Sequence, residues 1–247
     1  MPRLLIAPDA EHAAQTAAIQ IDELITAYRH DADVVHIALA GGSTPRQAYA
    51  MLAARRQDWS GVHLWFGDER VVPLDSDDAN ARMVDEALVR PAGIPDVQIH
   101  RVPTQLGPAG ACIAYADELR RLLPLDAAGL PMLDIAVLGL GEDGHTASLF
   151  PGSDALHDDG RICAVVENSP KPPPVRVTMT MAVLNAARVR IMLTAGTGKA
   201  AAVAAALADP DERVPASLLA RQGTTWILDE AAAQSARREI TAVPDGE

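Results

Sequence analysis

Residues 133–153 read LDIAVLGLGEDGHTASLFPGS, a short apolar run followed at once by a glycine-rich segment that carries two acids and one histidine. The run at 133–138 predicts a buried strand of a parallel sheet, because such strands are apolar on both faces. The glycines allow the backbone to turn sharply where the strand ends. We therefore expect His145 at the carboxyl edge of the sheet, where open α/β proteins bind their ligands.

Apolar runs alternate with helical patterns along the rest of the chain as well. A strand-like run at 34–40, for example, precedes a helical pattern at 45–56. Strands that alternate with helices in this way predict βαβ units and a parallel sheet. The last helix is expected to begin near Asp229, which suits an N-cap. The other expected elements are strands or extended segments at 3–7, 62–67, 97–102, 161–166, 188–195 and 224–228, and helices at 10–28, 80–89, 111–123 and 199–208.

Length and composition limit the class of protein. The 247 residues suit one large domain or two small ones, but no linker divides them, so we expect a single domain over residues 1–247. The chain is 49% hydrophobic and 22% charged, as soluble globular proteins are. Its net charge of −12 provides no basic field for nucleic acid. No apolar run can span a membrane or serve as a signal peptide, so we expect a cytoplasmic protein. We also expect a monomer rather than an obligate oligomer.

The loop after the run at 34–40 has the features of an anion site. It contains four small residues, Gly41, Gly42, Ser43 and Thr44. We expect a hydroxyl cap, with Pro45 as the first residue of the helix that follows. Exposed amides at the positive end of a helix suit a phosphate group, although a capped turn without a ligand is an equally good interpretation. The spacing matches neither the Walker A loop nor the dinucleotide fingerprint.

Two other strand exits carry basic residues. Arg70 follows Asp68 and Glu69, and its planar guanidinium could hold a phosphate; an ion pair among these neighbours is the alternative. Lys199 lies at the junction between the strand pattern at 188–195 and the helix pattern at 199–208. A lysine in the first turn of a helix is unfavourable for the helix dipole, so a bound anion would offset that penalty. A solvated lysine is the alternative here.

His145 is the candidate for proton transfer. Histidine titrates near neutral pH, and Asp143 or Glu142 could orient its ring or raise its basicity. A structural histidine is the alternative. The three side chains lack the ligand spacing of zinc enzymes, so we expect no metal. Because no Gly-x-Ser-x-Gly elbow is present, water is the expected nucleophile if the reaction is hydrolysis.

Four segments, in this order, resemble the 6-phosphogluconolactonase family. They are GGSTPRQAYAML at 41–52, WFGDERVVPLDSDDAN at 65–80, the segment at 133–153, and VRVTMTMAVLNAARVRIMLTAGTGKAAAV at 175–203. The resemblance covers essentially the whole chain. It implies a Rossmann-like three-layer α/β/α fold with a mostly parallel central sheet, shared with glucosamine-6-phosphate deaminases, ribose-5-phosphate isomerases and CoA transferases.

The resemblance also implies an activity, which is hydrolysis of 6-phospho-D-glucono-1,5-lactone to 6-phospho-D-gluconate in the oxidative pentose phosphate pathway, without a cofactor. His145 would be the general base, with Asp143 as its partner. This agrees with the chemistry of lactone opening, which needs a deprotonated water, donors for an oxyanion and a proton for the leaving oxygen. The substrate-binding residues would be Gly41, Gly42, Ser43, Thr44, Asp68, Arg70, Gly144, Arg176 and Lys199.

Two other functions are compatible with parts of this pattern. A deaminase or isomerase acting on glucosamine 6-phosphate would use a carboxylate such as Asp68, but it has DEY where this chain has DER, and AFNEP where this chain has ASLFP. A non-catalytic sugar-phosphate-binding regulator would carry a DNA-binding segment. The first strand pattern starts at Arg3, so we expect no such segment, which favours the lactonase. A non-catalytic sugar-phosphate-binding protein without this segment is the remaining alternative, and it requires that His145 be misplaced for catalysis.

Overall fold

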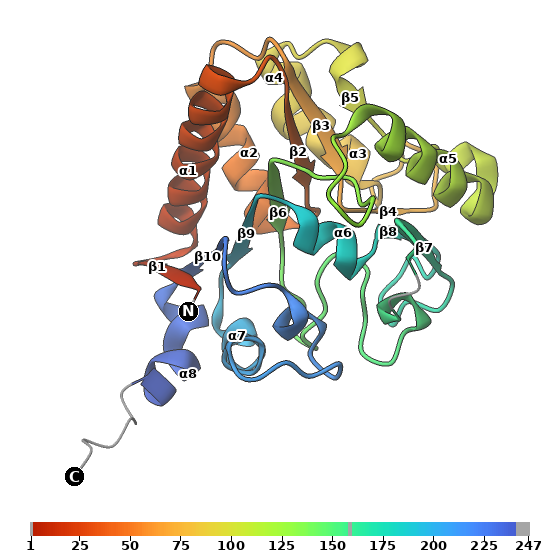
Figure 1. Cartoon of the computed structure of the whole chain (residues 1–247). Coiled ribbons are helices and arrows are strands. Elements are labelled where there is room, and N and C mark those ends of the chain that lie inside the picture. The colour runs from red at the N-terminus through yellow and green to blue at the C-terminus, as the bar shows by residue number, and fades with distance from the viewer. Residues whose placement is uncertain (1, 158–159, 241–247) are drawn as a thin grey trace.

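The computed structural model describes residues 2–157 and 160–240, and its centre is a parallel sheet (Figure 1). Seven strands follow the order β1-β10-β9-β6-β2-β3-β5, and every neighbouring pair is parallel. The expected mostly parallel α/β sheet is confirmed. Its strands are β1 (Arg3–Ala7), β2 (Val35–Leu39), β3 (Val62–Phe66), β5 (Ile99–His100), β6 (Ile135–Leu138), β9 (Val189–Thr194) and β10 (Thr224–Asp229).

A second sheet, which the sequence patterns did not indicate, has three antiparallel strands. These are β4 (Asp68–Arg70), β8 (Arg176–Met179) and β7 (Cys163–Val166), in the order β4-β8-β7. The segment at 161–166 was expected to be extended. Arg70 and Arg176 are directly paired across β4 and β8, although they lie far apart in the sequence. The small sheet therefore brings two of the predicted phosphate-binding side chains together.

Helices flank the parallel sheet and complete the expected three-layer arrangement (Figure 1). Helix α1 begins after Asp9, whose carboxylate accepts a hydrogen bond from the His12 amide, and it buries a stripe of Ala and Ile. It packs closely on α2, while α7 packs on α8. The helices are α1 (Ala10–Asp31), α2 (Ser43–Arg55), α3 (Asn80–Val84), α4 (Arg90–Ala92), α5 (Gly107–Leu122), α6 (Met181–Ala186), α7 (Ala200–Leu207) and α8 (Glu230–Ile240), with a π-helical turn at Asp85–Val89 between α3 and α4.

Two buried tyrosines fix the ends of neighbouring strands at the carboxyl edge of the sheet. The Tyr49 hydroxyl, from α2, bonds both the amide and the carbonyl of Ala40, at 2.8 and 3.1 Å. The Tyr115 hydroxyl, from α5, does the same for Phe66, at 2.8 and 3.0 Å. Burial raises the pKa of both phenols, so the hydroxyls stay protonated and can donate. The loops that follow these strands therefore start from fixed positions.

The caps of two helices test the predictions about helix starts. Asp229 Oδ1 accepts a hydrogen bond of 2.7 Å from the Ala232 amide, which confirms the predicted start of the last helix. The prediction for α2 is wrong, because that helix begins at Ser43 and its N-cap is Gly42, with φ of 111° and no side-chain cap. Glycine tolerates this φ, and no hydroxyl covers the first amides of α2. No helix among the described residues is long and apolar enough to cross a membrane.

Candidate active site

His145 and Asp143 lie together in the loop that follows β6. The Nδ1 atom of His145 is 2.5 Å from Oδ1 of Asp143, and the histidine side chain is 16% exposed. Burial lowers the pKa of His145 and outweighs the opposite effect of the Asp143 carboxylate. The histidine is therefore neutral at physiological pH. When Nδ1 carries the ring proton and donates a hydrogen bond to the carboxylate, Nε2 is the nitrogen that can accept a proton.

Two glycines allow this loop to fold around the pair. A Cβ atom on Gly141 would lie 2.0 Å from Nδ1 of His145 and 2.4 Å from Oδ1 of Asp143, so any side chain there would displace both groups. Gly144 has φ of 83°, and a Cβ atom there would lie 2.7 Å from Cγ1 of Val214. The Gly144 carbonyl also accepts a hydrogen bond of 2.9 Å from the Ala216 amide. Gly144 thus shapes the loop and does not line the cavity described next.

The His145 ring opens on a cavity of about 270 Å³ at the carboxyl edge of the sheet. This volume is close to the lower end of the usual range for small-molecule sites, which is about 300–1,000 Å³. Loops after β2, β3, β6 and β9 and the strands of the small sheet contribute to its walls. The lining residues are Ala40, Gly41, Gly42, Asp68, Arg70, Asn80, Gly139, Leu140, Gly141, His145, Ala147, Lys171, Pro172, Arg176 and Lys199.

Four cationic side chains face this cavity. Arg70 and Arg176 come from the small sheet, and Lys171 and Lys199, the only lysines of the chain, come from separate loops. Burial and the charge of Lys171 lower the pKa of Lys199. Burial and the charge of Arg70 act in the same direction on Arg176. Positive charges that repel one another in this way are stabilised when an anion binds among them.

Arg70 and Arg176 differ in how far the protein already satisfies them. Arg176 donates to the carbonyl oxygens of Pro173 and Lys171, at 2.9 and 3.0 Å, and its Nη1 lies 3.8 Å from Asp68 Oδ2. Arg70 donates one hydrogen bond from Nη1, to the Asp78 carbonyl at 2.6 Å. Its Nε is buried and has no hydrogen-bond partner among the described residues. A buried donor without a partner is costly, so Arg70 has unused capacity for a ligand.

The buried Glu69 holds Arg70 and Asn80 in place. Its carboxylate accepts hydrogen bonds from the amides of Arg70, Asn80 and Ala81, at 2.8, 2.7 and 2.7 Å. Burial raises the pKa of Glu69 to about 7, against the effect of these three donors. The Asn80 side chain in turn donates to the Asp68 carbonyl at 2.9 Å. The start of α3 is thereby tied to β4.

The cavity contains most, but not all, of the residues that the sequence suggested. Ser43 and Thr44 do not line it, although they form the first turn of α2 behind Gly42. Lys171 and Asn80 do line it, and sequence reasoning gave neither a role. Lys171 lies in the segment SPKPPPVRV at 169–177, whose prolines favour an extended surface connection. Its one available signal was that lysine is rare in this arginine-rich chain.

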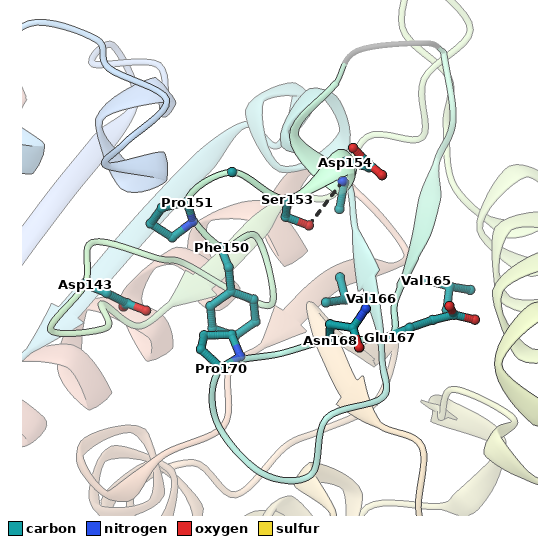
Figure 2. A pocket seen from close by; sticks show the side chains of 12 residues that line it. Asp143, Phe150, Pro151, Ser153, Asp154, Val165, Val166, Glu167, Asn168 and Pro170 are labelled. Atoms are coloured by element: carbon teal, nitrogen blue, oxygen red, sulfur yellow. Dashed lines mark hydrogen bonds between the residues drawn. The ribbon is translucent and has the colours of Figure 1, made fainter.

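A larger pocket of about 630 Å³ adjoins the cavity and is shown in Figure 2. Phe150 lines this pocket, and its ring centroid lies 4.4 Å from that of the His145 ring, which lines the smaller cavity. The pocket contains the carboxylates of Asp143, Asp154 and Glu167, and no basic side chain lines it. Charge therefore directs a phosphorylated ligand to the smaller cavity. No group of three or more His, Cys, Asp or Glu residues in the described ranges could hold a metal ion.

Comparisons with known proteins agree with this geometry. Residues 8–227 match the family model described as glucosamine-6-phosphate isomerases/6-phosphogluconolactonase. A 6-phosphogluconolactonase of Synechocystis sp. is 38% identical over 203 residues, which cover 81% of this chain and 84% of the relative. The structure of 6-phosphogluconolactonase from Trypanosoma brucei has a TM-score of 0.87 at 32% identity, over 95% of this chain and 98% of that one. A monomeric glucosamine-6-phosphate deaminase, 19% identical, has a TM-score of 0.79 over 94% of this chain and 99% of its own, and so shares the fold.

Proposed function

The chain belongs to the glucosamine-6-phosphate isomerase/6-phosphogluconolactonase family, and from this premise we propose that it hydrolyses 6-phospho-D-glucono-1,5-lactone to 6-phospho-D-gluconate in the oxidative pentose phosphate pathway. The observation that carries the proposal is the His145–Asp143 pair, which opens on a cavity with four cationic side chains. The pair supplies a base for water. The cations supply a site for the phosphate group.

His145 acts first as a base and then as an acid. Neutral His145 takes a proton from water at Nε2 while the water oxygen attacks the lactone carbonyl carbon. The tetrahedral intermediate then collapses, the bond between carbon and the ring oxygen breaks, and the imidazolium returns the proton to that oxygen. Burial raises the pKa of Asp143, but hydrogen bonding to His145 outweighs this effect and lowers it, so Asp143 is a carboxylate. The carboxylate keeps the proton on Nδ1 of His145 and stabilises the imidazolium. Such a group contributes about 10² to 10⁴ in rate.

The phosphate group binds among the basic side chains of the cavity. Arg70 offers its guanidinium, and Lys199 offers an ammonium at the start of α7. Gly41 and Gly42 bring the uncapped end of α2 to the same wall, where its positive dipole favours an anion. Arg176 has a different part, since its hydrogen bonds are used to hold the 171–173 loop.

Asp68 distinguishes this activity from deamination of glucosamine 6-phosphate. A deaminase needs a carboxylate free to abstract a proton from carbon. Asp68 Oδ2 accepts a hydrogen bond of 2.6 Å from Ser148, and Arg176 lies beside it. These partners occupy Oδ2 of the carboxylate. Asp68 therefore orients its surroundings and is a poor candidate for the base.

The organisation of the protein is part of the proposal. We infer a single domain over residues 1–247, supported by one hydrophobic cluster that draws on residues from Ala7 to Ala236. We infer a monomer in the cytoplasm with a sugar phosphate as its small-molecule partner and with no cofactor. Light scattering after size-exclusion chromatography checks the mass, for which 26.1 kDa is expected.

The experiment that tests the activity measures lactone hydrolysis above its spontaneous background, with purified protein and without added metal. We expect a high rate with 6-phosphogluconolactone and no ammonia release from glucosamine 6-phosphate. Absence of acceleration on the lactone would overturn the lactonase proposal, and ammonia release would support the deaminase.

A further inference from the structure

Lys171 faces the cavity without a partner for its charge. Both lysines of the chain line this cavity, and no hydrogen bond or ion pair of either ammonium group occurs within residues 2–157 and 160–240. The phosphate site proposed above uses Arg70 and Lys199. A lactone has a second place where negative charge arises, which is the carbonyl oxygen during attack by water. Lys171 is free to meet it.

The backbone of Lys171 is fixed while its side chain is exposed. The Lys171 carbonyl accepts hydrogen bonds from Ser169 Oγ and Arg176 Nη2, at 2.8 and 3.0 Å. Its amide donates to Ser169 Oγ at 3.2 Å. Arg176 also bonds the Pro173 carbonyl, so one buried guanidinium anchors the whole turn. This arrangement holds the origin of the side chain beside the cavity and leaves the ammonium free to move onto a ligand.

Lys171 lines the same cavity as His145. Among the cations of the cavity, it has the largest electrostatic effect on His145, whose pKa it lowers. Because His145 must hold the attacking water, the carbonyl group has to lie beside the histidine. A cation close to His145 is therefore close to the developing oxyanion. For Lys199, burial and the charge of Lys171 lower the pKa, while Glu142 and Asp143 raise it.

We propose that Lys171 is a further catalytic residue, whose ammonium donates a hydrogen bond to the lactone carbonyl oxygen as negative charge develops there. This role rests on the lactonase function proposed above. As the bond from water oxygen to carbon forms, the proton passes to His145 and the carbonyl electron pair moves onto the oxygen beside Lys171. The pair returns when the ring bond breaks. Lys171 keeps its proton throughout.

The test compares Lys171→Met with Lys199→Met, which remove the two charges at similar side-chain length. Steady-state kinetics on the lactone give kcat and KM, and 6-phosphogluconate as a competitive inhibitor gives Ki. Loss of one oxyanion donor lowers kcat about 10²- to 10³-fold. We expect such a fall for Lys171→Met with little change in KM or Ki, whereas Lys199→Met raises both. Lys171→Arg, which keeps the charge, is expected to recover part of kcat.

The outcomes separate the possible failures. If Lys171→Met raises KM and Ki as Lys199→Met does, Lys171 binds phosphate and the proposal is wrong. If Lys171→Met matches the native enzyme, Lys171 has no role. Both results need an active native protein, so an inactive native protein refutes the lactonase function itself. A second readout is the acid limb of kcat/KM, which we expect at higher pH in Lys171→Met because a charge that lowers the His145 pKa is gone.

Discussion

Two groups of side chains contain histidine, one with three histidine rings and one with a single ring, and both include a carboxylate. In the first, His36, His63 and His100 lie side by side on β2, β3 and β5. His100 bonds Glu118 at 2.7 Å and His63 at 2.8 Å, while Trp65 donates to His36 at 3.1 Å. His36 and His100 are each 7% exposed. The rings are packed and bonded to one another.

The second group is His145 with Asp143, and it differs in what the ring can reach. His145 follows a strand, on a glycine loop at the carboxyl edge, and its ring lines a cavity. The other three histidines lie within strands, where the sheet fixes their direction. A histidine bonded to a carboxylate is therefore no sign of catalysis by itself. The useful sign is a second ring nitrogen that opens on a cavity of suitable charge.

The largest expected effect separates the two groups by activity. His145→Ala should lower kcat by about 10² or more, because the proposed mechanism assigns the proton from water to this ring. His63→Gln, in the first group, should leave kcat within a few-fold. Lactone turnover measures both variants, with circular dichroism to check the fold. Full activity in His145→Ala would show that the two groups do not differ in the way proposed.

The next effect separates the groups by stability in acid. Burial and the neighbouring His63 and His100 lower the pKa of His36 to about 4, so the folded state favours the neutral ring. The contribution of His36 to the free energy of unfolding is therefore complete above its unfolded-state pKa of about 6.5. It falls by roughly 3 kcal/mol as the pH drops towards 4. Glu118 and Asp134 are the carboxylates that face this group.

Urea unfolding between pH 7 and pH 4 measures this loss. His36→Gln keeps an acceptor for Trp65 but cannot be protonated, so its free energy of unfolding should depend less steeply on pH than that of the native protein. An unchanged pH dependence in this variant would mean that His36 does not carry the acid sensitivity.

A smaller effect is expected for the partner of His145. In Asp143→Asn the amide can still bond the ring but no longer stabilises the imidazolium. Loss of the carboxylate partner of a metal-bound histidine costs about 10- to 100-fold in activity, and we take the same range for this pair. We expect a kcat decrease in this range, with little change in KM. A decrease as large as that of His145→Ala would indicate that Asp143 has a more direct part in the reaction.

The smallest effect concerns backbone strain, which the structure has near His145. Ala147 lines the cavity with φ of 49°, the sole non-glycine residue in the described ranges with a positive φ. Ala147→Gly should raise the free energy of unfolding by about 0.5 to 1 kcal/mol, because glycine adopts this conformation without strain. Thermal unfolding is the measurement. A destabilised variant would mean that the turn tolerates alanine without cost.

The sequence predicted the parallel sheet because long, regular patterns produce it. Apolar strands and Ala-rich helices repeat over many residues, and each strand exit could be located from them. The small sheet escaped prediction because β4 has only three residues and pairs with β8, more than a hundred residues later. Patterns of two or three residues carry no usable period, and pairing between distant segments leaves no local signal.

The candidate site was predicted in part, for the same reason. Three site residues, His145, Arg70 and Lys199, follow strands, and open α/β sheets bind their ligands at the carboxyl ends of strands. Lys171 reaches the cavity through the turn that Arg176 anchors, and no strand exit indicates its position. The cap of α2 was misjudged because Ser43 suits a cap by type, whereas the backbone needs the positive φ that Gly42 provides.

The central claim is that neutral His145 accepts the proton from water, and one paired titration tests it most directly. The ring of His145 is followed by NMR as a function of pH, with His145→Ala used to assign its signal, and kcat/KM is measured over the same range. We predict that the pKa of the ring and the pKa of the acid limb coincide, both below the usual value of about 6.5. A rate that stays constant across the pH range where His145 becomes protonated would contradict the claim.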